Sequence, residues 1–351
     1  MTDETATDMP TRAPPKANRL VPRPILDSLR ALGLVFAIVV IAAFFQIQNQ
    51  AFLSPENVLT IVRSMASLAI IAFAQLLVII AGELDLSVGA VYGLGATTLA
   101  VFWLGVGNVP FQLPLVLAIV VALGVGALAG GINAFFTTVV GIPSFIATLG
   151  MLSIAAGLEL LLSNASSFNP QYNLPPPSRV ELDIFRALGA TVLPFRIPIQ
   201  VLWLAVLFGI FWVLRHRTLF GFRLLAVGGN ADAARISRLP VRKYKWIVFV
   251  LSGVMAVVAG ILDFSYVGSV GPGSGSALTF PVFAAVVIGG ASLSGGRGTV
   301  IGTLIGATLL AVLRNGLAIM GVGAFAGLLF VGIVTIGAVS FDRLAFGRGK
   351  S

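Results

Sequence analysis

Cysteine is absent from this sequence, and histidine occurs once among its 351 residues. Without cysteine, the chain can form no disulfide, no thiolate metal site and no cysteine nucleophile. The single histidine, His216, lies between Arg215 and Arg217. We predict that its side chain is solvated or faces lipid headgroups, with a ligand or proton-relay role as the alternative. The sequence therefore predicts no catalytic residue, no metal site and no bound cofactor.

Charged residues are also scarce, at 10% of the chain, whereas apolar residues make up 58% and the mean hydropathy is +1.02. A soluble domain is about 25% charged and about 45–50% apolar. These proportions exclude an ordinary cytosolic enzyme, a disordered chain and a secreted disulfide scaffold. A membrane-spanning helix needs roughly 20 mostly apolar residues, so the composition suffices for about ten of them. We predict an all-α, polytopic membrane protein with about ten transmembrane helices.

The apolar stretches place the predicted spans near residues 30–47, 64–82, 86–104, 113–139, 144–163, 197–214, 246–264, 278–291, 299–319 and 323–341. The first stretch is predicted to be a retained span and not a signal peptide, because many further apolar stretches follow it. The segment 278–291 has only 14 residues. It is therefore either a tilted span or a re-entrant piece.

Lysine and arginine residues gather on one side of this predicted topology. With the N-terminus inside, 17 of the 22 fall in cytoplasmic segments, four fall outside and Arg314 lies within a span. This bias predicts that both termini are cytoplasmic. Basic cytoplasmic loops also account for the net charge of +9, so no nucleic-acid partner is expected.

The same topology divides the chain into one membrane domain and its flanking segments. We expect a flexible cytoplasmic tail at 1–28, a transmembrane domain at 29–342 and a short cytoplasmic tail at 343–351. Within the domain, a polar, proline-rich loop at 164–196 faces outside and a basic loop at 215–245 faces inside. A second outer loop, 265–277, is glycine-rich and is expected to be mobile.

The first motif, residues 82–89, places two carboxylates between apolar runs with almost no room for a loop. Its notable residues are Glu83, Asp85, Ser87 and Gly89. Asp85 or Ser87 can accept hydrogen bonds from the N–H groups that begin the next helix, where negative charge is favoured. A helix cap at a tight connection is the preferred interpretation. A catalytic carboxylate pair is the alternative, and no metal ligands or nucleophile accompany it.

The second motif begins at Gly228-Gly229 in the basic loop. Asn230 is a good N-cap, Asp232 falls in the first turn, and Pro240 prevents the helix from continuing. The pattern predicts a helix of about two turns. It either lies on anionic lipid or docks in a protein groove, and its small residues favour docking. The predicted contact residues are Asn230, Ala231, Asp232, Ala233, Ala234, Arg235 and Ser237.

The third motif is glycine-rich and spans 289–298. It departs from the phosphate-binding loop pattern at its last two positions, so we expect no nucleotide binding by this chain. A tight turn between two spans is predicted, formed by Gly289, Gly290, Ser292, Gly295, Gly296 and Arg297. Gly298, Gly302 and Gly306 follow at four-residue spacing and predict a close-packed helix face.

Few polar residues lie inside the predicted spans. Gln75, Asn133 and Asn315 are candidates for a substrate pathway. Glu159 and Asp263 lie near predicted outer ends, where we expect them to reach water. The shortage of carboxylates and bases at the midplane argues against an ion-coupled pump and favours a neutral, hydroxyl-bearing or apolar cargo.

Four motifs closely resemble those of the permease subunits of bacterial ABC sugar importers of the ribose/xylose/galactose type, which are related to branched-chain amino-acid permeases. Here they are AGELDLSVG, GIPSFIATLG, GGNADAARISRLP and GGASLSGGRG, the last followed by GTLIGATLLAVLRNGL. They occur in order, and the resemblance extends from about residue 54 to residue 342.

This resemblance implies a multi-pass protein of the bacterial inner membrane, surrounded by lipid and paired with a second permease copy. It also implies a cytoplasmic ABC ATPase, a periplasmic sugar-binding protein, and a coupling role for the helix at 230–239. ATP hydrolysis would then belong to the partner subunit. Alternatives are an ABC permease for branched-chain amino acids or another small metabolite, and a self-sufficient secondary transporter.

Two departures from the family pattern stand out. Arg238-Leu239-Pro240 stands where the family usually has a glycine-containing turn, and 278–283 stands where an acidic stretch is common. We expect the first departure to affect which ATPase binds, and the second to affect which substrate is carried.

Overall fold

The computed structural model describes residues 23–323, 327, 329–330, 332–333 and 336–337, and these are helical wherever they form regular structure. Within them, seven helices are long and apolar enough to cross a membrane. They are α1 (Arg23–Gln48), α2 (Pro55–Ile80), α4 (Leu115–Phe135, continued by a π-turn at Phe136–Val140), α5 (Ser144–Ser163), α7 (Ile199–His216), α10 (Val241–Val267) and α12 (Val300–Ile319).

The described residues also form one turn of 3₁₀-helix, Pro194–Arg196, and five shorter α-helices. Three are apolar: α3 (Val88–Leu104), α8 (Leu219–Gly229) and α11 (Thr279–Ile288). The other two are α6 (Arg179–Gly189) and α9 (Ala231–Ile236). The all-helical prediction is confirmed for the described residues. The predicted span at 323–341 falls largely outside them, so the count of ten stays a prediction.

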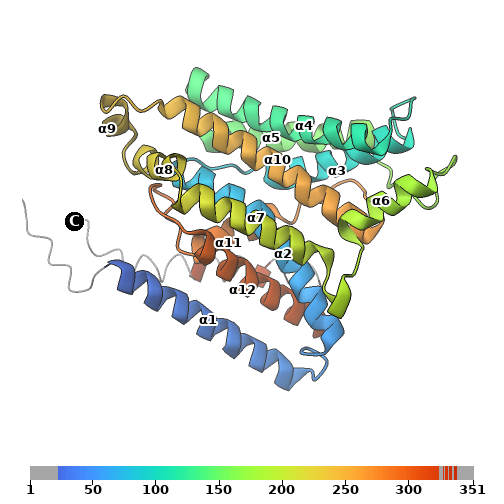
Figure 1. Ribbon diagram of the computed structural model, residues 1–351, viewed down its shortest axis with the longest axis horizontal. Helices are drawn as coiled ribbons and strands as arrows, with labels where there is room; N and C mark the ends of the chain where they lie inside the picture. The colour runs from blue at the N-terminus through green and yellow to red at the C-terminus, as the bar shows by residue number, and fades with distance from the viewer. Residues whose placement is uncertain (1–22, 324–326, 328, 331, 334–335, 338–351) are drawn as a thin grey trace, which may run out of the picture.

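The long helices lie side by side, with α8 and α9 at one end of the bundle and α6 at the other (Figure 1). We call these the α9 end and the α6 end. The core lies around α2, of whose apolar stretch 83% is buried, whereas the corresponding figure for α7 is 17%. Large apolar side chains are exposed on α1, α4, α5 and α7. Such surfaces are expected where helices face lipid.

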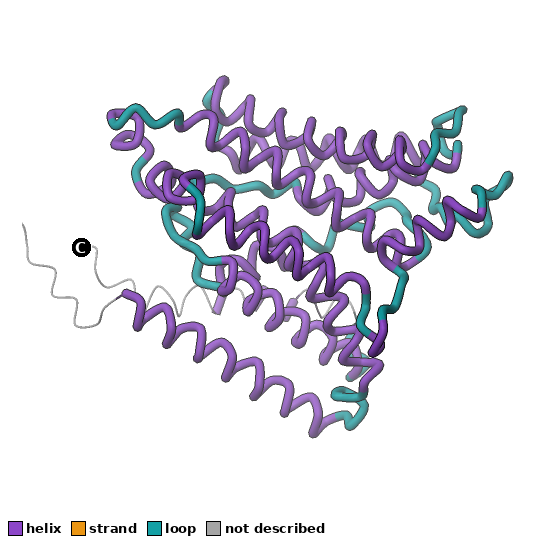
Figure 2. Tube along the Cα trace, viewed as in Figure 1, coloured by secondary structure: helices purple, strands orange, loops and turns teal. Residues whose placement is uncertain are grey.

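Two of the apolar helices, α3 and α11, are short, and each crosses only part of the bundle. α3 follows the non-helical connection 81–87, and α11 lies between the loop 268–278 and the turn 289–299 (Figure 2). At 1.5 Å per residue, α3 is about 25 Å long and α11 about 15 Å. The loop 268–278 begins beside α6 and α11 runs toward the α9 end, so the chain does not return to the end from which it came, and the structure does not support the re-entrant interpretation of 278–291.

The first turns of α3 and α11 meet inside the bundle. The N–H of Gly89 donates to Thr279 Oγ1 at 3.3 Å. A Cβ atom built on Gly275 would lie 1.9 Å from the carbonyl oxygen of Gly89, so the two backbones are in direct contact. From this meeting point α3 runs toward the α6 end and α11 toward the α9 end (Figure 1).

Several predicted boundaries differ from the structure. The largest difference is at α2, which begins at Pro55, nine residues before the predicted start at 64. Three other differences involve basic residues. α1 begins at Arg23, inside the predicted tail, and α7 and α10 extend into the basic loop, which shrinks to 217–240. In each case arginine or lysine residues lie on the end of a helix. A long basic side chain can extend toward water while its backbone remains helical. The other predicted loop, 164–196, contains α6.

Candidate functional site: a glycine junction between three motifs

The short helix α9 is formed by local hydrogen bonds. Asn230 Oδ1 accepts from the N–H groups of Asp232 and Ala233, at 3.1 and 3.0 Å, which confirms the predicted N-cap. Arg235 pairs with Asp232 at 2.7 Å on the exposed face. Ala233 is exposed and Ile236 is 84% exposed, whereas Ala234 is buried. The exposed face of α9 therefore contains Ala233 and Ile236, and Ala234 packs inward.

Arg238, after α9, has a left-handed backbone with φ of +59°. This conformation costs a non-glycine residue roughly 1–2 kcal/mol. Glycine adopts it freely but loses about 0.5–1 kcal/mol through its larger unfolded-state entropy. We predict that Arg238→Gly raises the free energy of unfolding by up to about 1 kcal/mol, measured as a thermal shift in detergent.

Ser237 provides the matched control, because its φ of −76° suits any residue. Ser237→Gly should lower stability by about 0.5–1 kcal/mol. Equal destabilisation by both glycine variants would contradict the strain assigned to Arg238.

The three glycine motifs converge where α8 ends. A Cβ atom built on Gly228 would lie 1.6 Å from the carbonyl oxygen of Ile80 and 2.9 Å from the nitrogen of Gly296. A Cβ on Gly295 would lie 2.5 Å from the carbonyl oxygen of Gly228 and 2.9 Å from the Cα of Gly82. The N–H of Gly296 donates to Ile80 O at 2.9 Å. We call Gly82, Gly228, Gly295 and Gly296 the glycine junction.

Backbone conformation adds a second reason for glycine at this junction. Gly82, Gly295 and Gly296 have φ values of +79°, +79° and +71°, where side chains are unfavourable. The junction therefore brings the end of α2, the segment before α9 and the turn between α11 and α12 into direct backbone contact. The turn itself contains hydrogen bonds from Ser292 N to Arg297 O and from Gly295 N to Ser292 O. The predicted tight turn is thus present.

The predicted helix face of three glycines is divided between two locations. Gly302 and Gly306 lie on α12, where Cβ atoms would come within 2.0 Å of Gly289 O and 2.1 Å of Ala285 O. They pack α12 closely against α11 and the residue that follows it. Gly298 instead precedes α12 and contacts Leu76 of α2, so it does not belong to that face. Gly298 keeps the four-residue spacing of Gly302 and Gly306 although it precedes the helix. The spacing alone therefore does not show where α12 begins.

Asp85 is the centre of a buried polar network. Its Oδ1 accepts from the N–H and hydroxyl of Ser87, at 3.0 and 2.6 Å, and its Oδ2 accepts from Ser252 Oγ at 2.8 Å. Asn133 Nδ2 donates to Ser87 Oγ at 3.0 Å, and Gln75 Nε2 donates to the carbonyl oxygen of Asp85 at 3.1 Å. The network connects α2, the 81–87 connection, α4 and α10.

This network modifies the cap predicted at the start of α3. Ser87 is the N-cap residue, but its side chain makes no capping bond to the helix. Asp85 instead binds the N–H of the N-cap residue itself. Nothing in the local sequence indicates the third donor to this carboxylate, Ser252, because it lies on α10.

The other carboxylate of the first motif, Glu83, forms an ion pair with Lys245 of α10. Their side chains are only 9% and 17% exposed. Lys245 falls in the predicted basic loop 215–245, and its contact with Glu83 could not be predicted because the two residues are 162 positions apart. The two carboxylates thus lie in different environments, which disfavours a catalytic pair.

The three predicted pathway residues fall into two places. Gln75 and Asn133 both join the Asp85 network, Gln75 through the Asp85 carbonyl oxygen and Asn133 through Ser87, and both are buried. Asn315 of α12 instead exchanges two hydrogen bonds with Asn57 of α2, at 2.8 and 3.0 Å. Their role in a substrate pathway stays a prediction.

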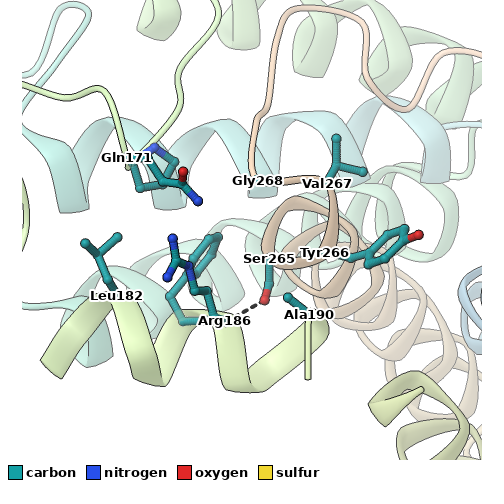
Figure 3. A pocket seen from close by; sticks show the side chains of 10 residues that line it. Gln171, Leu182, Arg186, Ala190, Ser265, Tyr266, Val267 and Gly268 are labelled. Atoms are coloured by element: carbon teal, nitrogen blue, oxygen red, sulfur yellow. Dashed lines mark hydrogen bonds between the residues drawn. The ribbon is translucent and has the colours of Figure 1, made fainter. Parts of the chain in front are cut away.

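At the α6 end, a cavity of about 130 Å³ lies between the 164–178 loop, α6 and the end of α10 (Figure 3). Ser265 Oγ donates to the carbonyl oxygen of Phe185 beside it. Gln171 and Arg186 line the same cavity. It is a small surface feature next to the 268–278 loop.

Comparisons with known proteins agree with the four sequence motifs. The family described as branched-chain amino acid transport system / permease component matches residues 57–339. The ribose import permease protein RbsC of Bacillus subtilis strain 168 is 36% identical over 315 residues, which cover 90% of this chain and 93% of RbsC. The xylose transport system permease protein XylH of Escherichia coli strain K12 is 32% identical over 370 aligned positions, covering 90% and 92%.

Two further similar proteins are described as ABC transporters or their permeases. YphD of Escherichia coli strain K12, described as a probable ABC transporter permease protein, is 35% identical over 322 residues, covering 92% of each chain. A solved structure described as a metal-chelate type ABC transporter in an inward-facing conformation is 16% identical, with a TM-score of 0.45 and coverage of 91% of this chain and 99% of that chain. On the family match and the identity to these relatives, the chain belongs to the branched-chain amino acid transport system / permease component family, as a multi-pass protein of the inner membrane.

Proposed function

We propose that this chain is the permease subunit of an ABC importer for a monosaccharide or related polyol. A periplasmic binding protein would deliver the cargo, and a separate cytoplasmic ABC ATPase would drive two permease copies. The names of RbsC and XylH, which specify ribose and xylose, favour a pentose-sized sugar over an amino acid. The scarcity of ionisable residues within the spans is consistent with an uncharged cargo.

The observation that carries this proposal is the glycine junction. In the proposed orientation the α9 end is cytoplasmic, because it holds the basic loop 217–240. The ATPase would bind the exposed α9 face at Ala233 and Ile236. A displacement of α9 would pass through Gly228 to α2 and to the turn 289–299, because no side chain separates these backbones. The short helix α3 follows α2 after the 81–87 connection, and the short helix α11 leads directly into the turn 289–299.

Ala233→Arg tests ATPase docking. The variant should lose at least about tenfold in co-purification with the cognate ATPase, because a bulky charge would occupy a site built for a methyl group. The matched control is Ala187→Arg on α6, an exposed alanine at the opposite end. Membrane insertion of both variants should equal that of the parent. Undiminished co-purification of Ala233→Arg would overturn the assignment of α9.

Uptake assays separate the alternatives. The proposal predicts ATP-dependent uptake of labelled D-ribose or D-xylose that L-leucine does not inhibit. Uptake of L-leucine instead would favour the branched-chain amino-acid alternative, which the family description suggests. Uptake by the purified chain in vesicles without ATP would favour a secondary transporter.

A further inference from the structure

The loop between α10 and α11, residues 268–278, is held at several points although its sequence predicts mobility. Phe168 and Val270 exchange two backbone hydrogen bonds, of 2.8 and 3.0 Å. Gly271 lies against Ser167, where a Cβ atom would come within 2.4 Å of the hydroxyl oxygen. We call 268–278 the glycine strap. Its first half is thus attached to the loop that precedes α6.

Glu159 of α5 holds the middle of the strap. Its Oε1 accepts from the N–H of Gly273 at 3.2 Å and from Thr97 Oγ1 at 3.4 Å. The residue is only 3% exposed, so the expectation that it reaches water is wrong. A Cβ atom on Gly93 would lie 2.8 Å from this carboxylate oxygen, so the glycine there leaves room for it.

The end of the strap leads into α11. Gly275 packs on the backbone of Gly89, and Thr279 accepts the hydrogen bond from Gly89. α11 then ends at Ile288, and a Cβ atom on the next residue, Gly289, would lie 2.4 Å from Gly302 O. The helix is therefore fixed to the α6-end loops through the strap and is followed directly by the turn that enters the glycine junction.

We propose that Glu159 is a positioning residue that couples the α6-end loop to α11 through the glycine strap. This inference rests on the proposed function: docking of the loaded binding protein on the 164–178 loop shifts the strap and, with it, the first turn of α11. Four of the eleven strap residues are glycine, so few side chains are available to hold it. The Glu159 carboxylate supplies a charge-assisted hydrogen bond to the strap backbone at its centre.

ATPase measurements on the assembled importer in nanodiscs test the coupling. In Glu159→Ala, stimulation by the loaded binding protein should fall about tenfold, the factor expected from losing a hydrogen bond to a charged group. Basal ATPase activity should not change. Glu159→Gln should restore stimulation, because its amide oxygen still accepts from Gly273. Exposed Glu56, replaced by alanine, is the control. Full stimulation in Glu159→Ala, or equal loss in Glu159→Gln, would overturn the proposal.

A crosslinking measurement separates this inference from the proposed function. The parent chain has no cysteine, so Phe168→Cys with Val270→Cys creates the only thiol pair. A hydrogen-bonded antiparallel pair has Cα atoms about 5.5 Å apart, within the range of about 4.4–6.8 Å for a disulfide. Oxidation in membranes should crosslink this pair. Adding Glu159→Ala should slow the reaction about tenfold, and adding Glu159→Gln should not.

The two experiments distinguish failure of the role assigned to Glu159 from failure of the proposed function. Equal crosslinking rates with and without Glu159→Ala would overturn the role of Glu159, whatever the importer carries. Absence of binding-protein stimulation in the parent, with the expected crosslinking pattern intact, would instead overturn the proposed function and, with it, the coupling. The crosslinking assay needs neither the ATPase nor a cargo.

Discussion

Replacement of Gly228 by alanine should reduce transport at least about tenfold, while the same replacement at Gly229 should leave it intact. The methyl group at position 228 would meet the carbonyl oxygen of Ile80 at 1.6 Å, far inside contact distance. That atom belongs to the backbone, so it cannot rotate away, and the α8 end must separate from α2 and from Gly296. Overpacking of this kind costs about 1–3 kcal/mol or more. Because the atom approached belongs to the backbone, we expect at least about 1.4 kcal/mol, which corresponds to a fall in uptake of at least about tenfold.

Gly229 is a close control, because it is the next residue, ends the same helix and has open space where a Cβ atom would be. Since alanine is favoured over glycine in helices by about 1 kcal/mol, Gly229→Ala should be neutral or slightly stabilising. The measurements are uptake in cells and expression level in membranes. Loss of uptake with normal ATPase co-purification would place the defect at the junction and not at docking. Equal uptake in the two variants would contradict a tight junction.

Replacement of Lys245 by methionine should cause the largest loss of stability among the charge changes considered. Methionine keeps the aliphatic stem but leaves Glu83 as an unpaired carboxylate that is only 9% exposed. Removing one partner of a buried ion pair costs about 3–5 kcal/mol. We expect about 3 kcal/mol, at the lower end of that range, because Lys245 retains 17% exposure. Thermal unfolding in detergent measures the change.

A second substitution separates the ion pair from packing. Glu83→Gln in the Lys245→Met background should recover most of the lost stability, because the unpaired charge is then gone. Lys243→Met removes an equivalent charge two residues away on the exposed surface and should change stability by less than about 0.5 kcal/mol. If Lys245→Met and Lys243→Met unfold at the same temperature, Lys245 makes no important contact with Glu83.

Much of the helical layout could be predicted from hydropathy alone. Predicted spans at 144–163 and 299–319 differ from α5 and α12 by at most one residue. The Asn230 cap was equally predictable, because a capping side chain bonds to backbone groups two or three residues away. The extent of α7 and α10 was not, since basic side chains at a membrane surface are compatible with both helix and loop.

The candidate site was predictable in its residues but not in its assembly. Each glycine motif was visible, yet only the structure shows that Gly228 contacts Ile80 and Gly296. For Glu159, the sequence indicated exposure to water because it lies near a helix end. The glycine strap covers it, and the strap comes from residues more than a hundred positions later in the chain.

The amino-acid sequence by itself determined that this protein is helical, crosses a membrane and contains glycine-rich breaks, because hydropathy and backbone freedom are properties of single residues and short segments. Tertiary structure alone decided which breaks touch, which carboxylate is paired with lysine and which is covered by a loop. Those outcomes depend on distances between segments far apart along the chain, and the distances are set by how whole helices pack.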